Sequence, residues 1–135
     1  MTDPMPSKAD SRLRSDAVGW LTTVRPDHRP QTSPIWFLWA EGRIVIYSRP
    51  DTAKLRNIAV TGTAAFNLDG NGMGGDIVTI EADAVIDKTL PPAHEVPDYV
   101  SKYADHMTRI GHTPESFAAD YSVPVVLSVR RVRAW

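Results

Sequence analysis

The sequence predicts a mainly β fold with α-helical insertions, in which six strands form an antiparallel barrel and helices pack at its edges. Two observations support this class. Alternation of apolar and polar residues recurs along the chain, and short turn segments separate most of the alternating stretches, as hairpins require. The period changes to helical spacing in two places, after Ser48 and after Asp98.

The six predicted strands share alternation or β-branched composition, and they comprise residues 18–24, 31–40, 43–48, 64–68, 78–86 and 123–129. Glu41-Gly42 is typical of a two-residue hairpin turn. The glycine-rich segment 69–76 formally matches a dinucleotide motif, but a strand follows it, so we interpret it as a hairpin loop. Val132 breaks the alternation of the last strand, which predicts a bulge at Arg130-Arg131.

Helical segments are expected between and before these strands. The spacing of Leu55 and Ile58, with Gly62 as a stop signal, predicts a short helix. Two further helices are expected over residues 99–110 and 114–121.

The N-terminal residues are expected to contribute little to the barrel. We expect residues 1–11 to be a flexible tail, residues 12–18 to form a short helix, and residues 12–135 to be a single domain.

Composition excludes several classes of function. The chain has 135 residues, the size of one domain, and no cysteine, so disulfides, thiolate nucleophiles and sulfur-ligated metals are excluded. A net charge of -1 lacks the basic excess typical of nucleic-acid or anionic-membrane binding. No apolar run approaches the roughly twenty residues of a membrane span, and the N-terminus lacks the order of a signal peptide. We expect a cytoplasmic protein.

Lys54 is the single residue that most clearly indicates a binding site. A cation in the first turn of a helix opposes the helix dipole by about 0.3–1 kcal/mol unless an anion lies there. Ser48 at the end of the preceding strand, Arg56 and the free helix amides add donors at the same place. This pattern favours a cradle for a phosphate-bearing cofactor. The alternative is a solvated helix face on which Lys54 pairs with Asp51 or Glu41.

The aromatic residues concentrate on the first three predicted strands. Trp36 and Trp39 point to opposite faces of one strand, because side chains alternate along a strand. One of these faces lies outside the barrel, which indicates a dimer partner or a planar ligand. No metal site is expected, because the four histidines lack the spacing of metal ligands.

Five segments carry a resemblance to a known family: Trp20–Val24, Pro34–Phe37, Ile46–Ser48 with Lys54–Asn57, Gly75–Val78 and Ser122–Pro124. They resemble the split-barrel flavin and deazaflavin oxidoreductase superfamily, the pyridoxamine 5'-phosphate oxidase-like group, and within it the actinobacterial subgroup of probable F420-dependent enzymes. The resemblance implies a six-stranded antiparallel split barrel, the FMN-binding split barrel, that forms a homodimer with two cofactor sites at its interface.

The resemblance also implies roles for individual residues. The cofactor phosphate would be held by Ser48, Lys54, Arg56 and Asn57. The tricyclic ring would be lined by Gln31, Ser33, Pro34, Ile35, Trp36, Ile46 and Tyr47. The C-terminal end, with Arg131, Arg133 and Trp135, would reach the site of the partner chain.

In such enzymes reduced F420 delivers a hydride to a small unsaturated or quinone-like substrate. The sequence leaves the proton donor open between Tyr47, the one candidate catalytic residue, and bulk water. Two alternatives remain: an FMN-dependent oxidase or reductase of the same fold, and a non-catalytic protein that binds F420, a flavin or haem. Haem oxygenase-like activity ranks last, because it needs an axial histidine and His28 falls in a turn.

Overall fold

The structure is a computed structural model that describes residues 5–135. Its elements in chain order are α1 (Ser7–Ser15), β1 (Gly19–Val24), β2 (Pro30–Ile35), β3 (Leu38–Ala40), β4 (Arg43–Ser48), α2 (Ala53–Thr61), β5 (Thr63–Leu68), β6 (Val78–Ile86), the 3-10 turn η1 (Ala93–Glu95), α3 (Pro97–Arg109), α4 (Pro114–Asp120) and β7 (Val123–Ala134).

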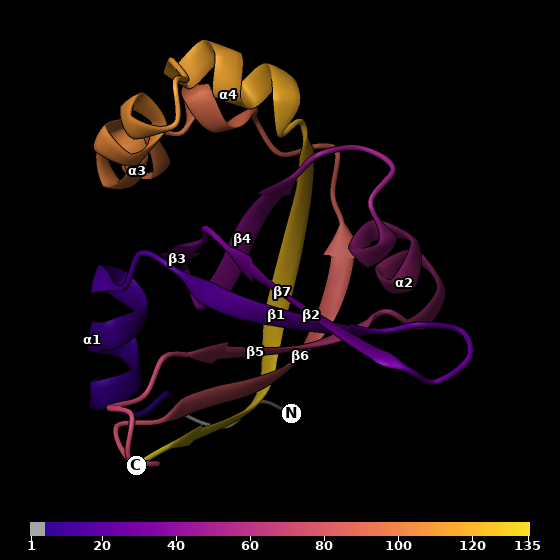
Figure 1. Cartoon of the computed structure of the whole chain (residues 1–135), viewed down its shortest axis with the longest axis vertical. Coiled ribbons are helices and arrows are strands. Elements are labelled where there is room, and N and C mark those ends of the chain that lie inside the picture. Colours follow the sequence, from indigo (N-terminus) through magenta and orange to yellow (C-terminus); the bar gives the residue numbers. More distant parts are fainter. Residues whose placement is uncertain (1–4) are drawn as a thin grey trace.

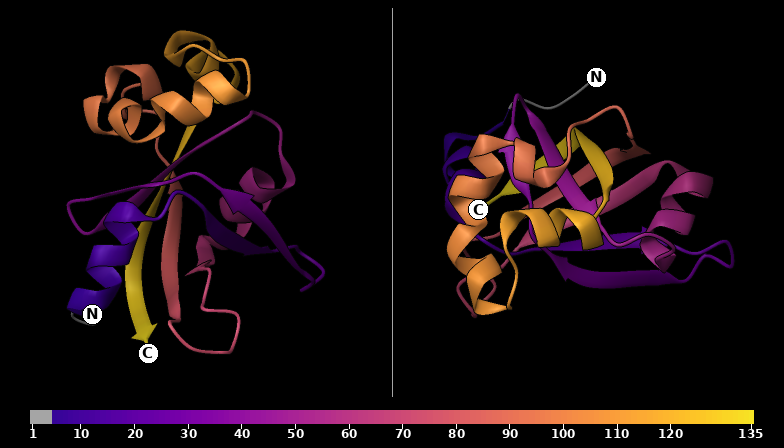
Figure 2. Two further views of the ribbon diagram at one scale, coloured as in Figure 1. Left: turned by 60° about the vertical axis from the view of Figure 1, so that its left-hand side comes forward. Right: turned by 90° about the horizontal axis from the view of Figure 1, so that it is seen from above.

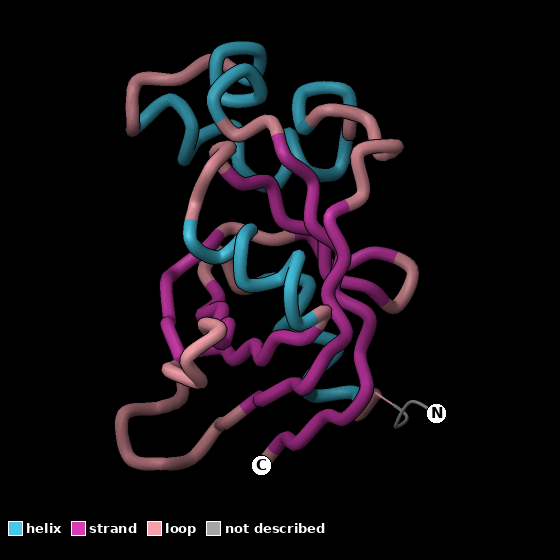
Figure 3. Tube along the Cα trace, turned by 90° about the vertical axis from the view of Figure 1, so that its right-hand side faces the viewer, coloured by secondary structure: helices cyan, strands magenta, loops and turns pink. Residues whose placement is uncertain are grey.

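The strands form one antiparallel sheet in the order β2-β1-β5-β6-β7-β4-β3. The sheet curls around a common interior (Figure 1), and α2 lies over one side of it (Figure 3). Its two edge strands, β2 and β3, follow each other in the chain, so residues 36 and 37 join the two edges covalently. The predicted mainly β, antiparallel split-barrel class is confirmed.

The structure has seven strands where the sequence predicts six, because the predicted strand 31–40 is divided after Ile35. Helix α3 explains the division. The Phe37 amide donates to the Tyr103 hydroxyl at 2.8 Å, and Lys102 Nζ donates to the Phe37 carbonyl at 2.9 Å. Side chains of α3 thus satisfy backbone groups that a strand partner would otherwise bind.

The barrel interior holds the larger apolar core. Phe37 and Phe66, both almost fully buried, meet edge to face with ring centroids 5.0 Å apart. Gly19 allows the approach of Phe66, since a Cβ at Gly19 would lie 2.3 Å from the end of that ring. Strand β6 contributes its alternate residues to this core, and its dry face agrees with the sequence prediction.

Two local predictions about turns and register are also confirmed. Glu41 and Gly42 both have positive φ, 55° and 72°, as a two-residue hairpin turn between β3 and β4 requires. On β7, Arg131 pairs with Glu81 while Val129 pairs with the next residue of β6, Ala82. The intervening Arg130 is therefore the extra residue of a β-bulge.

The N-terminal helix differs from its prediction. Helix α1 spans Ser7–Ser15, where the sequence suggested a tail to residue 11 and a helix over 12–18. Ala9 and Leu13 are buried in the barrel core, and Asp10 accepts a hydrogen bond of 2.8 Å from Trp39 Nε1. These contacts hold residues 7–11 against the barrel. Residues 1–4 of the predicted tail lie outside the described residues.

A helical layer of η1, α3 and α4 covers one end of the barrel, opposite the C-terminus (Figure 2). Tyr99, Tyr103 and Met107 recur every four residues along α3, so they share the helix face that packs inward. They form a second apolar cluster with Phe117 of α4 and Tyr47 of β4. The two predicted helices 99–110 and 114–121 are confirmed with small shifts of their ends.

Across residues 5–135, no helix combines the length and the apolar composition that crossing a membrane would need.

Candidate functional site

A cavity of about 430 Å³ lies where β2, β4 and the start of α2 meet the helical layer. It is lined by Val18, Pro34, Ile35, Trp36, Tyr47, Ser48, Arg49, Thr52, Lys54, Tyr99, Ile110, Phe117 and Tyr121. Six of these residues belong to the site predicted from the sequence. We refer to this space as the main cavity.

One part of the main cavity is polar and positively charged. Lys54 lies in the first turn of α2 and also lines the adjoining cavity. Within residues 5–135, its ammonium group has no ion pair and no hydrogen bond, so the alternative pairing with Asp51 or Glu41 is not found. Partial burial lowers the pKa of Lys54 below its usual value. Arg49 lines the same cavity and adds a second cation.

Two hydroxyl groups stand beside Lys54. Ser48 is buried, and its Oγ donates to the Arg49 carbonyl at 2.8 Å and lies 3.2 Å from Thr52 Oγ1. Thr52 precedes α2, but its side chain makes no capping bond to the helix amides. The free amides at the start of α2 therefore remain available to an anion.

The other part of the main cavity is aromatic. Trp36 is stacked between Tyr103 and Phe117, with ring centroids 4.8 Å and 5.2 Å away. Tyr121 stacks on Phe117 at 4.4 Å, and the Arg49 guanidinium lies 4.9 Å from the Tyr121 ring centroid. The outward face of Trp36 is thus covered largely by the helices of its own chain, where the sequence suggested a dimer partner or a planar ligand.

The tyrosines of the second apolar cluster differ in their hydrogen bonds. Tyr47 donates to the Pro91 carbonyl at 2.8 Å, and burial raises its pKa. Its proton is therefore engaged within the fold, which weakens Tyr47 as a proton donor to a substrate. The Tyr103 hydroxyl bonds to backbone groups of Phe37. The Tyr99 hydroxyl is buried without a hydrogen-bond partner among the described residues.

Two further cavities lie near the Lys54 end of the main cavity. A small one of about 120 Å³ is lined by Thr23, Gln31, Ser33, Thr52, Ala53 and Lys54, and it shares Thr52 and Lys54 with the main cavity. A groove of about 610 Å³ is lined by Arg25, Pro26, Pro30, Gln31, Ala53, Arg56, Asn57 and Val60. The groove shares Gln31 and Ala53 with the small cavity, so the three spaces adjoin in a row.

Some predicted residues lie apart from the main cavity. Ile46 is packed in the barrel core and lines none of the three spaces. Asn57 is buried and donates to Thr23 Oγ1 at 3.0 Å, which is a structural contact between α2 and β1. Arg56 donates to the Asp51 carbonyl at 2.7 Å and, of the three spaces, lines only the groove of about 610 Å³, which we call the outer groove.

The predicted partner-chain residues lie at the opposite end of the molecule from the helical layer (Figure 1). The side chain of Arg133 forms an ion pair of 2.8 Å with that of Glu81, and the backbone groups of Trp135 and Ile77 are hydrogen-bonded to each other. Arg131 lies next to the bulge, and its backbone is in register with that of Glu81 on the neighbouring strand β6. Within one chain these residues do not reach the main cavity.

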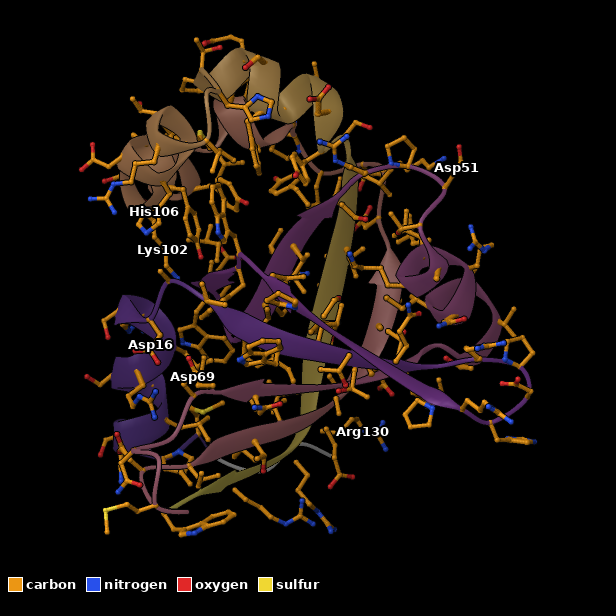
Figure 4. The ribbon with its side chains drawn as sticks, in the orientation of Figure 1. Asp16, Asp51, Asp69, Lys102, His106 and Arg130 are labelled. Atoms are coloured by element: carbon orange, nitrogen blue, oxygen red, sulfur yellow. The ribbon has the colours of Figure 1, made fainter. Side chains whose placement is uncertain are left out.

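The sequence prediction omitted much of the aromatic wall. Tyr99, Ile110, Phe117 and Tyr121 come from the helical layer, more than fifty residues after β4. Figure 4 shows two other residues of α3, Lys102 and His106, facing the barrel below them. The inward spacing of Tyr99, Tyr103 and Met107 was the one sequence signal that this layer packs on the barrel.

The histidines form no cluster of metal ligands. In the part of the chain that the structure describes, no group of three or more His, Asp or Glu residues could hold a metal ion. His112 instead places Nδ1 2.9 Å from Ser116 Oγ, in the capping box of α4.

Comparisons with known structures agree on the fold. The conserved hypothetical protein Rv2991 from Mycobacterium tuberculosis is 20% identical, with 99% of this chain and 86% of that chain covered and a TM-score of 0.76. A structure described as an F420 reductase is 24% identical over 96% of this chain and 97% of its own, with a TM-score of 0.65. HutZ, the heme storage protein from Vibrio cholerae, is 14% identical over 95% and 93%, with a TM-score of 0.64.

These identities show a shared fold. A search among curated protein sequences found no match. The family model described as pyridoxamine 5'-phosphate oxidase matches residues 5–135, which covers the barrel and the helical layer. The chain therefore belongs to the pyridoxamine 5'-phosphate oxidase family, within the split-barrel flavin and deazaflavin superfamily.

Proposed function

We propose that the chain is an F420-dependent oxidoreductase that reduces a small unsaturated or quinone-like substrate. The single observation that carries the proposal is Lys54, a partly buried ammonium group that lines two cavities and has no ion pair within residues 5–135. Removing a cation from water without a partner costs free energy. A phosphate bound at Lys54 would recover that cost through a charge-assisted hydrogen bond.

The residues around Lys54 fit such an anion. Arg49 supplies a second cation, and the uncapped start of α2 supplies amide donors. Ser48 would have to rotate away from the Arg49 carbonyl to donate to a phosphate. The proposed phosphate site therefore comprises Lys54, Arg49, Thr52 and Ser48, with the amides at the start of α2.

The row of three spaces favours F420 over FMN. F420 carries an acidic tail beyond its phosphate, so it is the longer anion of the two. From Lys54 the small cavity leads past Gln31 to the outer groove, where Arg25 and Arg56 lie. Arg25 pairs with Asp27 at 3.3 Å on the surface, an exposed contact that contributes little and can be exchanged for a ligand carboxylate.

The aromatic part of the main cavity fits a planar ring. Trp36, Phe117 and Tyr121 line this part of the cavity, and Pro34 and Ile35 add apolar surface. F420, when bound, supplies the hydride. The contribution of the chain is to hold the ring and the substrate in contact and to exclude water from them.

A homodimer is part of the proposal. The exposed Trp135 and the C-terminal arginines Arg131 and Arg133 lie far from the main cavity of their own chain. In a dimer this end of β7 would contact the cofactor site of the partner.

A side-by-side titration with F420 and FMN tests the proposal. We expect isothermal titration calorimetry to show a micromolar or lower dissociation constant for F420 and at least tenfold weaker binding of FMN. Turnover is then measured with reduced F420 and a panel of quinones and enones. The reverse preference would assign the chain to FMN, and failure to bind either cofactor would remove the proposed function.

A non-catalytic role in binding or storage is the second candidate. The observation that favours it is the Tyr47 hydroxyl, whose proton is engaged by the Pro91 carbonyl. Tight F420 binding without turnover of any quinone or enone would support this role. A single robust turnover would exclude it.

A further inference from the structure

Arg49 and Tyr121 meet across two layers of the fold, since Arg49 directly follows β4 and Tyr121 directly follows α4. The Arg49 guanidinium lies 4.9 Å from the centroid of the Tyr121 ring, within the range of a cation–π contact. Phe117 stacks on the same ring at 4.4 Å, so the guanidinium takes the face that Phe117 leaves. Both faces of the Tyr121 ring are thus engaged within the protein.

Among the described residues, the ring of Tyr121 is the main contact that restrains the Arg49 side chain. Arg49 is exposed, and an exposed arginine samples many rotamers, of which few reach a given anion. No carboxylate of residues 5–135 lies within ion-pair distance of its guanidinium. Tyr121 raises the pKa of Arg49, and Asp120 adds a smaller contribution, so both groups lie within electrostatic reach of it.

This restraint matters because Arg49 lines the main cavity together with Lys54. A cation that is already held in place loses less side-chain entropy on binding an anion than a freely rotating one does. We propose that Tyr121 is a positioning residue whose ring holds the Arg49 guanidinium at the wall of the main cavity, so that Arg49 and Lys54 bind one phosphate group together. The inference rests on the proposed function, because it concerns the phosphate site of that function.

Inorganic pyrophosphate is the probe, because it keeps the anionic group and has no ring that could stack on an aromatic residue. Tyr121→Leu removes the aromatic ring, and Tyr121→Phe keeps it. In isothermal titration calorimetry at neutral pH, Tyr121→Leu should bind pyrophosphate about fivefold more weakly than the wild type, and Tyr121→Phe should stay within about twofold of it. Equal affinities for the wild type and Tyr121→Leu, equal losses in both variants, or a wild type that does not bind pyrophosphate would overturn the inference.

A double-mutant cycle with Arg49→Gln separates positioning from structural damage, since Tyr121 also packs on Phe117. Arg49→Gln should itself weaken pyrophosphate binding. Because Tyr121 acts through Arg49, adding Tyr121→Leu to Arg49→Gln should weaken it no further. The same loss in both backgrounds would mean that the ring supports the cavity by packing, and would overturn the inference. An Arg49→Gln variant with the wild-type affinity would overturn it too.

Two further variants control for the place of the probe and for a different anchor of Arg49. Pyrophosphate binding that Lys54→Ala leaves unchanged would place the anion outside this site and overturn the inference. Asp120 is the different anchor, and its carboxylate, 3.7 Å from His112 Nε2, repels an anion. Asp120→Asn should therefore bind pyrophosphate at least as tightly as the wild type. A loss as large as that of Tyr121→Leu would show that the carboxylate, and not the ring, positions Arg49.

The wild type alone offers a spectroscopic test of the contact. Protons that lie over an aromatic ring are shifted to high field by the ring current, so the side-chain protons of Arg49 should show this shift in the nuclear magnetic resonance spectrum. Tyr121→Phe should retain the shift. Arg49 resonances at the position of a solvated arginine would overturn the inference, even where Tyr121→Leu does not fold.

The two proposals fail separately, because pyrophosphate carries neither the ring nor the tail of F420. If Tyr121→Leu weakens pyrophosphate binding through Arg49 but F420 does not bind, the inference stands and the proposed function fails. If F420 binds and Tyr121→Leu retains the pyrophosphate affinity of the wild type, the proposed function stands and the inference fails.

Discussion

The hydroxyl oxygen of Tyr103 lies 2.8 Å from both the amide nitrogen and the carbonyl oxygen of Phe37. The same hydroxyl lies 2.7 Å from the Ala17 carbonyl, in the connection between α1 and β1. One side chain of α3 thus joins three backbone groups at the place where the sheet edges β2 and β3 meet. This contact fixes the helical layer on the barrel and, with it, the aromatic wall of the main cavity.

Tyr103→Phe should therefore destabilise the protein. The change leaves the Phe37 amide unpaired in a buried position, and we expect a loss of about 1–3 kcal/mol in the free energy of unfolding. Urea denaturation followed by circular dichroism measures it. An unfolding free energy equal to that of the wild type would show that the hydroxyl does not anchor the helical layer.

Because the pKa of Lys102 is lowered in the folded chain, its contribution to the free energy of unfolding should increase at alkaline pH. Burial lowers its pKa from 10.5 to about 8, although Lys102 Nζ contacts the Phe37 carbonyl and ring. Between these two values the folded chain has released a proton that the unfolded chain still holds, so stability increases as pH rises through this window. Below it, both states are protonated and the contribution is constant.

The Lys102→Met variant isolates that effect. The difference in unfolding free energy between wild type and variant, measured by urea denaturation at pH values on both sides of the window, should shift in favour of the wild type as pH rises. A difference that stays flat would show that Lys102 titrates as an ordinary lysine.

Lys54→Ala should weaken F420 binding at least tenfold, or about 1.4 kcal/mol, without loss of stability. The ammonium is partly buried and unpaired among the described residues, so its removal costs the free protein no ion pair. Lys8→Ala is the control, since it removes one positive charge on α1, where Lys8 pairs with Asp76 at 3.0 Å. Equal affinities for wild type and Lys54→Ala would refute the phosphate assignment.

The affinity for F420 should also depend on the charge of Lys54. Burial lowers the pKa of Lys54 below its ordinary 10.5, so affinity should begin to fall at a lower pH than it would with an exposed lysine. Lys54→Arg keeps its charge across this range and should lack the decline. Calorimetric titrations of both proteins at several alkaline pH values make the comparison, and parallel curves would contradict it.

A substitution at Trp135 tests the proposed dimer. Its side chain is 58% exposed in the single chain, so Trp135→Ala should leave the unfolding free energy of the monomer nearly unchanged. If the end of β7 completes the partner's site, the variant should dissociate at least tenfold more readily in analytical ultracentrifugation and bind F420 more weakly. A wild type that sediments as a monomer at high concentration would count against the partner role of Arg131, Arg133 and Trp135.

The sequence alone determined the elements that local chemistry controls. The Glu41-Gly42 turn follows from positive φ values that a two-residue hairpin needs. The alternation along β6 shows which face is buried, and the break in alternation at Val132 located the bulge at Arg130. Lys54 was found in the same way, because a cation in the first turn of a helix is a local departure from the preferred charge arrangement.

The tertiary structure alone decided how distant segments combine. The division of strand 31–40 depends on Tyr103 and Lys102, which lie more than sixty residues away and replace the strand partner of Phe37. Helix α1 begins at Ser7 because Ala9 and Leu13 pack into the barrel core, a gain that short-range propensity does not register. The aromatic wall of the main cavity has the same origin: packing free energy depends on which surfaces meet, and only the folded chain brings the surface of α3 and α4 onto Trp36.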